Sequence, residues 1–293
     1  MQSTRTWLIG IALTAMLAGT ALAAPAWQIE GTRNQIYLLG SVHFLRATDE
    51  PLSASLMAKH AAADVVVFEI DLGQLDPIEI AATMQRIAID PHGRDLADLL
   101  GEDAYRQATA LAADIDIDLA ALRPYEPWFV ALQITQIRLG QLGYDGTHGI
   151  EAQLAKQTAI DNKTTAGLET LEEQLTALDS LPVDVQQAFL MQTLEDAAEI
   201  DADLDRIVAA WRSADTRTLE EELLAGLKDF PALYDSILVN RNRAWTQQII
   251  DFVDRPSNYF IVVGALHLVG DDSVIHMLEQ AGYRARPLPT PPN

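Results

Sequence analysis

Two of the six histidines in this 293-residue sequence share a local pattern. The segments Leu38–His43 and Val262–His267 each place a histidine three residues after a glycine that ends an apolar run. The apolar runs predict strands, and glycine allows the sharp turn that would follow each of them. We therefore expect His43 and His267 just beyond the carboxyl ends of two strands, where open α/β sheets bind their ligands.

A carboxylate has the same placement. Glu69 directly follows the apolar run Val65–Phe68, and an ionisable group at the end of such a strand needs a partner or has a function. Two imidazoles and a carboxylate are a familiar ligand set for Zn, Mn, Fe or Co. The pattern predicts one metal site made by His43, His267 and Glu69, with two turn histidines and a salt-bridged glutamate as the alternative. Glu69 would act as a ligand or as a general base, and the spacing favours neither.

The elements that would carry these residues indicate an α/β (α+β-like) fold. Apolar runs predict strands near both ends of the chain, at 27–29, 36–39, 65–68, 259–263 and 283–288. The first two are separated by a turn-prone segment and predict a hairpin. The region from roughly residue 75 to 255 has helical spacing, with start signals such as Asp76-Pro77 and the capping box Thr170-x-x-Glu173. We expect a central sheet built from N- and C-terminal segments, with a large helical middle region as a cap.

The N-terminus predicts export. Arg5, the apolar run Trp7–Leu17 and the small-x-small step Ala21–Ala23 predict a signal peptide over residues 1–23, cleaved before Ala24. An uncleaved anchor is the alternative, but the run is short for a membrane span. We expect residues 24–293 to form a single periplasmic or secreted domain without a stable membrane span.

Composition narrows the function classes further. The sequence has no cysteine, which excludes disulfides, a thiol nucleophile and cysteine metal ligands. Its net charge of −22 disfavours nucleic acid and anionic membrane surfaces as partners, which leaves a peptide or small-molecule substrate. It contains no Gly-x-Ser-x-Gly elbow, His-Glu-x-x-His helix, P-loop or Gly-x-Gly-x-x-Gly motif. Three other histidines are expected to be structural or exposed: His60, His92 and His276. Three tryptophans at helical spacing are expected to be core residues: Trp128, Trp211 and Trp245.

The sequence resembles the TraB/GumN family, which is related to the Tiki metalloproteases, from about Trp27 to Leu288. The resemblance is carried by several short blocks: Leu38–His43, Val67–Glu69, Gly149–Glu151, Gly167–Thr170 with Gln174, Arg241-Asn242 and Val263–Gly270. It implies a metal-dependent protease that requires His43, His267 and Glu69. The first block has Ser41-Val42 where Thr-Ile is common in the family.

The resemblance adds further candidates. Asn242 could bind the metal or hold substrate, and Arg241 could stabilise an oxyanion; a helix cap or a surface pair is the alternative. Glu169 is either a site residue or a first-turn acid of a helix. A polar loop could line the cleft, although an ordinary loop is the simpler interpretation: Asp145, His148 and Glu151.

The sequence thus predicts an exported, metal-dependent hydrolase, peptidase-like, with a divalent cation (Mn, Co, Zn or Fe) between the two Gly-x-x-His motifs. One alternative is a protein that holds metal or haem without catalysis, although haem would need an aromatic-lined cleft and only 6% of the residues are aromatic. The other is an accessory role in envelope polysaccharide production, suggested by the GumN name alone.

Overall fold

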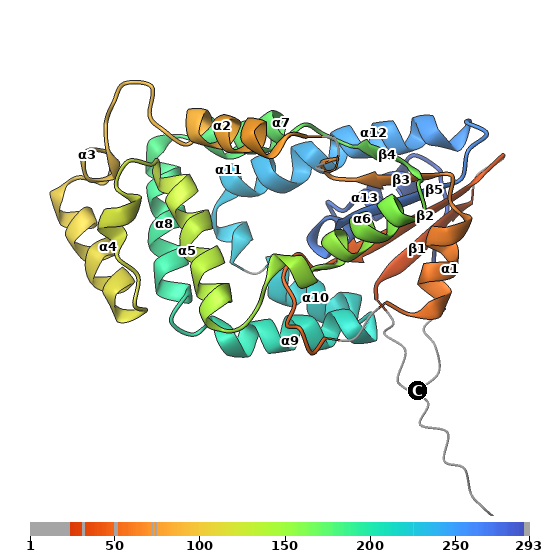
Figure 1. Cartoon of the computed structure of the whole chain (residues 1–293), viewed down its shortest axis with the longest axis horizontal. Coiled ribbons are helices and arrows are strands. Elements are labelled where there is room, and N and C mark those ends of the chain that lie inside the picture. Colours follow the sequence, from red (N-terminus) through yellow and green to blue (C-terminus); the bar gives the residue numbers. More distant parts are fainter. Residues whose placement is uncertain are drawn as a thin grey trace, which may run out of the picture.

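The computed structural model describes residues 24–30, 33–49, 52–71, 73, 75–224 and 226–289. A six-stranded mixed sheet lies at one end of the molecule, and the helical region extends away from it (Figure 1). The predicted α/β fold with a helical middle is confirmed. The predicted signal peptide, residues 1–23, lies outside the described residues. Within the described ranges, no helix is long and apolar enough to cross a membrane.

The sheet has the strand order β4-β3-β5-β2-β1-β6. Its strands are β1 Ala26–Glu30, β2 Gln35–Ser41, β3 Val65–Phe68, β4 Thr164–Gly167, β5 Tyr259–Gly264 and β6 Ala285–Pro287. β1 and β2 form the predicted antiparallel hairpin, whereas β5 pairs in parallel with β2 on one side and with β3 on the other. The carboxyl ends of β2, β3 and β5 therefore meet at one edge of the sheet.

One strand comes from the middle of the chain, which corrects the expectation of a sheet built only from the two ends. β4 lies between two helices in sequence and pairs in parallel with β3 at the edge of the sheet. Its sequence, Thr-Thr-Ala-Gly, lacks an apolar run and leaves the strand half-buried. The local sequence pattern does not predict a strand here. The segment is a strand because of its tertiary pairing with β3.

Helices surround the sheet and form the cap. α1 (Ala54–Ala62) connects β2 to β3, and α13 (Val274–Gln280) connects β5 to β6. The helical middle region contains α2 Pro77–Ile87, α3 Leu96–Leu100, α4 Glu102–Asp114, α5 Pro127–Gln141, α6 Ile150–Ile160, α7 Leu171–Asp179, α8 Val183–Asp196, α9 Ile200–Ser213, α10 Thr216–Leu224, α11 Pro231–Tyr234 and α12 Asn240–Val253. The predicted caps at Asp76 and Thr170 are present at the starts of α2 and α7. Helices α3, α4, α5 and α8 lie farthest from the sheet (Figure 1).

The core has an apolar layer on each face of the sheet. Phe260 and Val262 of β5 contribute to one layer, and Ile261 and Val263 contribute to the other. β5 is buried along its whole length, as expected for a parallel strand that is covered on both faces. The three predicted core tryptophans are buried: Trp128, Trp211 and Trp245.

Candidate active site

The two Gly-x-x-His motifs lie side by side in the sheet. β2 and β5 pair in parallel, with Ser41 opposite Gly264. A Cβ atom on Gly40 would lie 3.2 Å from the Cα of Ala265, and one on Gly264 would lie 3.2 Å from His43 Nε2. Gly264 has φ −53° and ψ 139°, which any residue can adopt. Each glycine is therefore needed for the space that it leaves to the other motif.

Glu69 reaches the same place from the other neighbour of β5. The point where a Cβ of Gly264 would stand lies 3.3 Å from Glu69 Oε1 and 3.7 Å from His267 Cδ2. The backbone N–H of Gly264 donates to Glu69 Oε1 over 2.7 Å. His267 follows in a short 3-10 helix, Ala265–Leu268. Three strand ends thus bring His43, Glu69 and His267 around the Cα of Gly264.

Both imidazole rings are held through Nδ1. His267 Nδ1 lies 2.6 Å from Asn242 Oδ1, and His43 Nδ1 lies 2.9 Å from Glu151 Oε1. The Asn242 side chain is itself fixed, because it is fully buried and donates to the carbonyl of Asp272 over 2.7 Å. The Nε2 atoms of both rings are left on the side of Glu69, with His267 Nε2 3.9 Å from Glu69 Oε1.

Arg241 supplies a cation at the edge of this group. Its Nη2 donates to Glu69 Oε2 over 2.8 Å and to Glu169 Oε1 over 2.7 Å, and its Nε donates to both oxygens of Glu169 over 3.1 Å. Its Nη1 lies 3.2 Å from His267 Nε2. The guanidinium also stacks 4.6 Å from the ring centroid of Trp245. Glu169, which precedes the N-cap of α7, thus fixes Arg241.

A π-helical turn presents Arg241 and Asn242 to the site. This turn, Asp235–Val239, joins α11 to α12, and Arg241 Nη1 donates back to the carbonyl of Ile237 over 3.0 Å. Single π turns of this kind are frequent at functional sites because they change the direction in which neighbouring side chains point. Neither residue acts as a helix cap or lies on the surface, which was the alternative from sequence.

Burial and neighbouring charges shift the pKa values of His43, Glu69 and His267 in different directions. Burial lowers the pKa of His267 to about 3, which favours a neutral ring. Burial opposes ionisation of Glu69, but the charges of His267, His43 and Arg241 and the amide of Gly264 outweigh it and lower the pKa to about 2. The Glu151 carboxylate raises the pKa of His43 to about 9. At neutral pH, a cationic His43 thus stands beside the Glu69 carboxylate and the neutral ring of His267, and a metal bound at His43 would displace the proton of its Nε2.

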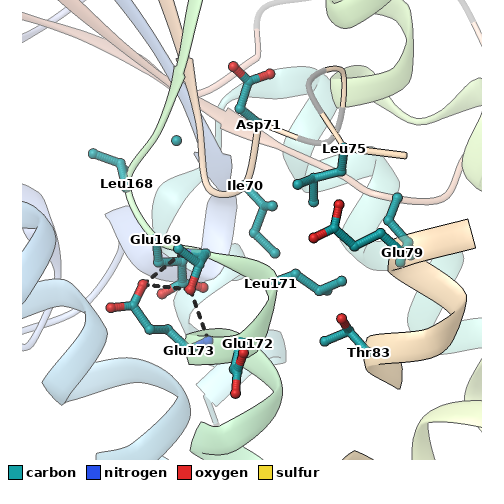
Figure 2. Close-up of a pocket in the computed structure, with 13 residues that line it drawn as sticks. Ile70, Asp71, Leu75, Glu79, Thr83, Leu168, Glu169, Leu171, Glu172 and Glu173 are labelled. Carbon is teal, nitrogen blue, oxygen red and sulfur yellow. Dashed lines mark hydrogen bonds between the residues drawn. The ribbon is translucent and has the colours of Figure 1, made fainter. Parts of the chain in front are cut away.

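A cleft opens onto His43 and Glu69, whereas His267 is buried behind them and is not part of the cleft lining. The cleft has a volume of about 670 Å³ and is lined by His43, Glu69, Glu151 and Gln174, together with one side of α6. A second hollow of about 550 Å³ lies across the segment 70–71, between α2 and the start of α7. Figure 2 shows the α2 side chains of this second hollow across from those of α7, with Leu171 between them. The cleft on the His43 side therefore connects His43 and Glu69 with solvent.

Sequence reasoning missed part of this arrangement. It placed Glu151, with Asp145 and His148, in a polar loop that could line the cleft and preferred an ordinary loop, whereas the structure has Glu151 in the first turn of α6, where it lines the cleft and contacts His43. Asp145 caps a short helix by accepting from the N–H of Thr147 over 2.7 Å. The family resemblance included Glu151 through its Gly-Ile-acid step, but that step does not indicate a contact with His43.

The side chains of His43, Glu69 and His267 are of types that bind a divalent cation, but Arg241 is hydrogen-bonded to two of them. Two imidazole nitrogens and a carboxylate oxygen are suitable ligands. In the described part of the chain, however, no group of three or more His, Cys, Asp or Glu side chains is spaced to hold a metal ion. Arg241 donates to both Glu69 and His267. A cation shared by these two residues therefore requires the guanidinium to leave His267.

Comparison with known proteins identifies the family to which the chain is similar. The sequence profile of the TraB/PrgY/gumN family matches residues 25–287. An uncharacterized protein of Escherichia coli, YbaP, is 26% identical over 91% of this chain and 96% of that protein. The metalloprotease TIKI2 of Danio rerio is 23% identical over 86% of this chain and 58% of that protein, and an uncharacterized protein of Treponema pallidum is 22% identical over 87% of this chain and 80% of that protein. No solved structure gives a significant match.

Proposed function

The chain belongs to the TraB/PrgY/gumN family, and from that premise we propose that it is a metal-dependent hydrolase, peptidase-like, whose divalent cation is held by His43, His267 and Glu69. The distant similarity to TIKI2 metalloproteases supports the reaction class. Mn, Co, Zn and Fe all suit this ligand set. The proposal includes export, so that protein recovered from the periplasm is expected to begin at Ala24.

One observation carries the proposal. A side chain on Gly264 would touch His43 Nε2 at 3.2 Å and Glu69 Oε1 at 3.3 Å, and would lie 3.7 Å from the ring of His267. Glycine keeps this point free, although its backbone angles would accept any residue. The ends of three strands thus bring two imidazoles and a carboxylate toward one point, as the binding of a shared cation requires.

The surrounding residues have distinct tasks in this proposal. Asn242 Oδ1 accepts a hydrogen bond from the Nδ1–H of His267, which leaves the Nε2 lone pair available as a ligand. The positively charged guanidinium of Arg241 lies beside Glu69. In that position it would stabilise the oxyanion that develops during hydrolysis of a carbonyl compound. A bound divalent cation supplies a Lewis acid and lowers the pKa of water.

Arg241 remains in the site when it releases His267. It has three hydrogen bonds to Glu169 and one to Glu69, against a single contact with His267 Nε2. A rotation that moves Nη1 away from His267 can preserve the pair with Glu169. Loading of the cation and retention of the arginine are therefore compatible.

The test begins with the mature chain, residues 24–293, titrated with Mn²⁺, Zn²⁺ and Co²⁺ in the wild type and in His43→Ala, His267→Ala and Glu69→Gln. We expect one site per chain, with at least a tenfold loss of affinity in each variant. A library of unstructured peptides then tests hydrolysis with and without a chelator. Unchanged affinity in either histidine variant would overturn the shared site. Tight binding without cleavage of any peptide would favour the alternative of a metal-binding protein that does not catalyse hydrolysis.

A further inference from the structure

The segment Gly149–Glu151 has no task in the metal site proposed above, although it lies against that site. It forms the start of α6, with Gly149 at the N-cap and Glu151 in the first turn. The helix runs from here along the cleft to the start of β4, and three of its alanines line the cleft: Ala152, Ala155 and Ala159. The question is why the chain begins this helix beside His43.

Gly149 allows the start of α6 to lie directly on the His43 backbone. A Cβ atom on Gly149 would lie 2.0 Å from the carbonyl oxygen of His43 and 2.7 Å from its carbonyl carbon, which no side chain could tolerate. The next residue fastens the contact, because the N–H of Ile150 donates to the carbonyl of Val42 over 3.1 Å and the Ile150 side chain is fully buried. Glu151 is thereby delivered to a fixed position next to the ring of His43.

The His43 ring has little else to hold it. Its side chain is 57% exposed, whereas the Glu151 side chain is 23% exposed. By contrast, His267 is buried and packs against Trp245, with 4.5 Å between the ring centroids. A carboxylate can only accept a hydrogen bond, so the contact over 2.9 Å places a proton on His43 Nδ1 and directs Nε2 toward Gly264.

The hydrogen bonds of the Glu151 carboxylate do not compensate for its burial. Oε1 accepts from the buried hydroxyl of Ser41 as well as from His43. Oε2 is buried and has no hydrogen-bond partner among the described residues. An unpaired buried carboxylate oxygen is unfavourable for folding. This residue is therefore better explained by its effect on His43 than by a contribution to stability.

We infer that Glu151 is a positioning residue, which orients the imidazole of His43 for its part in the proposed site and is the counterpart of Asn242 on His267. The inference rests on the proposed function for the meaning of that orientation. Partners of this kind change metal affinity or activity by about 10–100-fold when they are removed. Since the backbone contact is made by Gly149 and Ile150, α6 stays in place when the Glu151 side chain is changed.

Two variants of the full mature chain separate orientation from charge. Glu151→Gln keeps the shape and an acceptor oxygen, and Glu151→Ala removes both. The control is Glu102, an exposed acid in the first turn of α4 at the far end of the molecule, changed to Gln and Ala in parallel. We expect the Mn²⁺ affinity to fall by about 10–100-fold in Glu151→Ala, to fall less in Glu151→Gln, and to stay unchanged in both Glu102 variants. All four variants should remain folded, which thermal unfolding checks.

A second readout does not depend on the metal proposal. The imidazole N–H protons that are hydrogen-bonded to Glu151 and to Asn242 should give low-field proton resonances, assigned with His43→Ala and His267→Ala. Glu151→Ala should remove the His43 signal and leave the His267 signal. Persistence of the His43 signal would overturn the inference, as would wild-type Mn²⁺ affinity in Glu151→Ala when His43→Ala has lost binding. Wild-type affinity in His43→Ala would instead overturn the proposed function, and the resonances would still show whether Glu151 holds the ring.

Discussion

A methyl group at Gly264 is the sharpest perturbation of the candidate site. In Gly264→Ala, the new Cβ would lie 3.2 Å from His43 Nε2 and 3.3 Å from Glu69 Oε1, a few tenths of an ångström closer than ordinary carbon contacts. Glu69 cannot retreat, because Arg241 and the Gly264 amide hold it. The exposed ring of His43 is the group that moves.

The expected magnitudes differ for stability and for function. Overpacking costs about 1–3 kcal/mol, and replacing glycine by alanine at a permitted backbone conformation returns about 0.4–1 kcal/mol. The net loss of folding free energy is about 0–2.6 kcal/mol. Displacing a catalytic group by 1 Å can cost about 100-fold in rate. A shift of a few tenths of an ångström, combined with a methyl group at the convergence point, should lower Mn²⁺ affinity and hydrolysis by about 10–100-fold.

Gly140→Ala is the matched control. Gly140 lies in α5, and a Cβ there would meet nothing within 4 Å, so the change should stabilise the helix by about 0.5–1 kcal/mol without altering function. Urea unfolding gives the stability of both variants, and Mn²⁺ titration and peptide hydrolysis give their function. A folded Gly264→Ala protein with wild-type affinity and activity would refute the idea that the space at Gly264 is the reaction centre.

Three further changes test the supporting residues. Asn242→Ala should lower Mn²⁺ affinity by about 10–100-fold, because the Nδ1 proton of His267 loses its acceptor; an unchanged titration would contradict an orienting role. Arg241→Lys keeps the charge but loses the planar fork that pairs with two carboxylates, so urea unfolding should show a loss of about 1–3 kcal/mol, and an equal midpoint would show that the fork does not stabilise the fold. Burial lowers the pKa of His60, whose Nε2 lies 2.9 Å from Thr158 Oγ1; the unfolded chain therefore takes up a proton first as the pH falls below about 6.5, and wild-type stability should drop there. The side chain introduced by His60→Gln cannot titrate, so the stability of this variant relative to the wild type should increase as the pH falls from about 7 to about 5. Stability curves that stay parallel would contradict the burial argument.

Much of the sheet follows from short-range pattern. Val65–Phe68 and Tyr259–Gly264 are apolar runs that have no favourable place outside a covered sheet. Glycine marks the end of β5 and lies one residue before the end of β2. β4 could not be predicted in this way. Its two threonines and its glycine carry no apolar periodicity, and the segment becomes a strand because β3 offers it a hydrogen-bonding edge.

The candidate site divides along the same line. His43, Glu69 and His267 share a local position after strands, so the sequence could group them before any contact was known. Glu151 and Glu169 act through residues 108 and 72 positions away, respectively, and their local patterns are those of ordinary acids near helix starts. Nothing in a single sequence distinguishes a carboxylate that faces water from one that faces a histidine on a distant strand.

The position of β5 has a consequence for the order in which the molecule can assemble. β5 stands between β3 and β2, although it is made after nearly nine-tenths of the chain. A chain synthesised only as far as residue 258 has two separated strand groups, and it lacks both Gly264 and His267. Closing the sheet across more than 190 intervening residues is a slow, long-range event. The candidate site is therefore incomplete until β5 has been made and paired, since this last long strand completes both the core and the cluster of His43, Glu69 and His267.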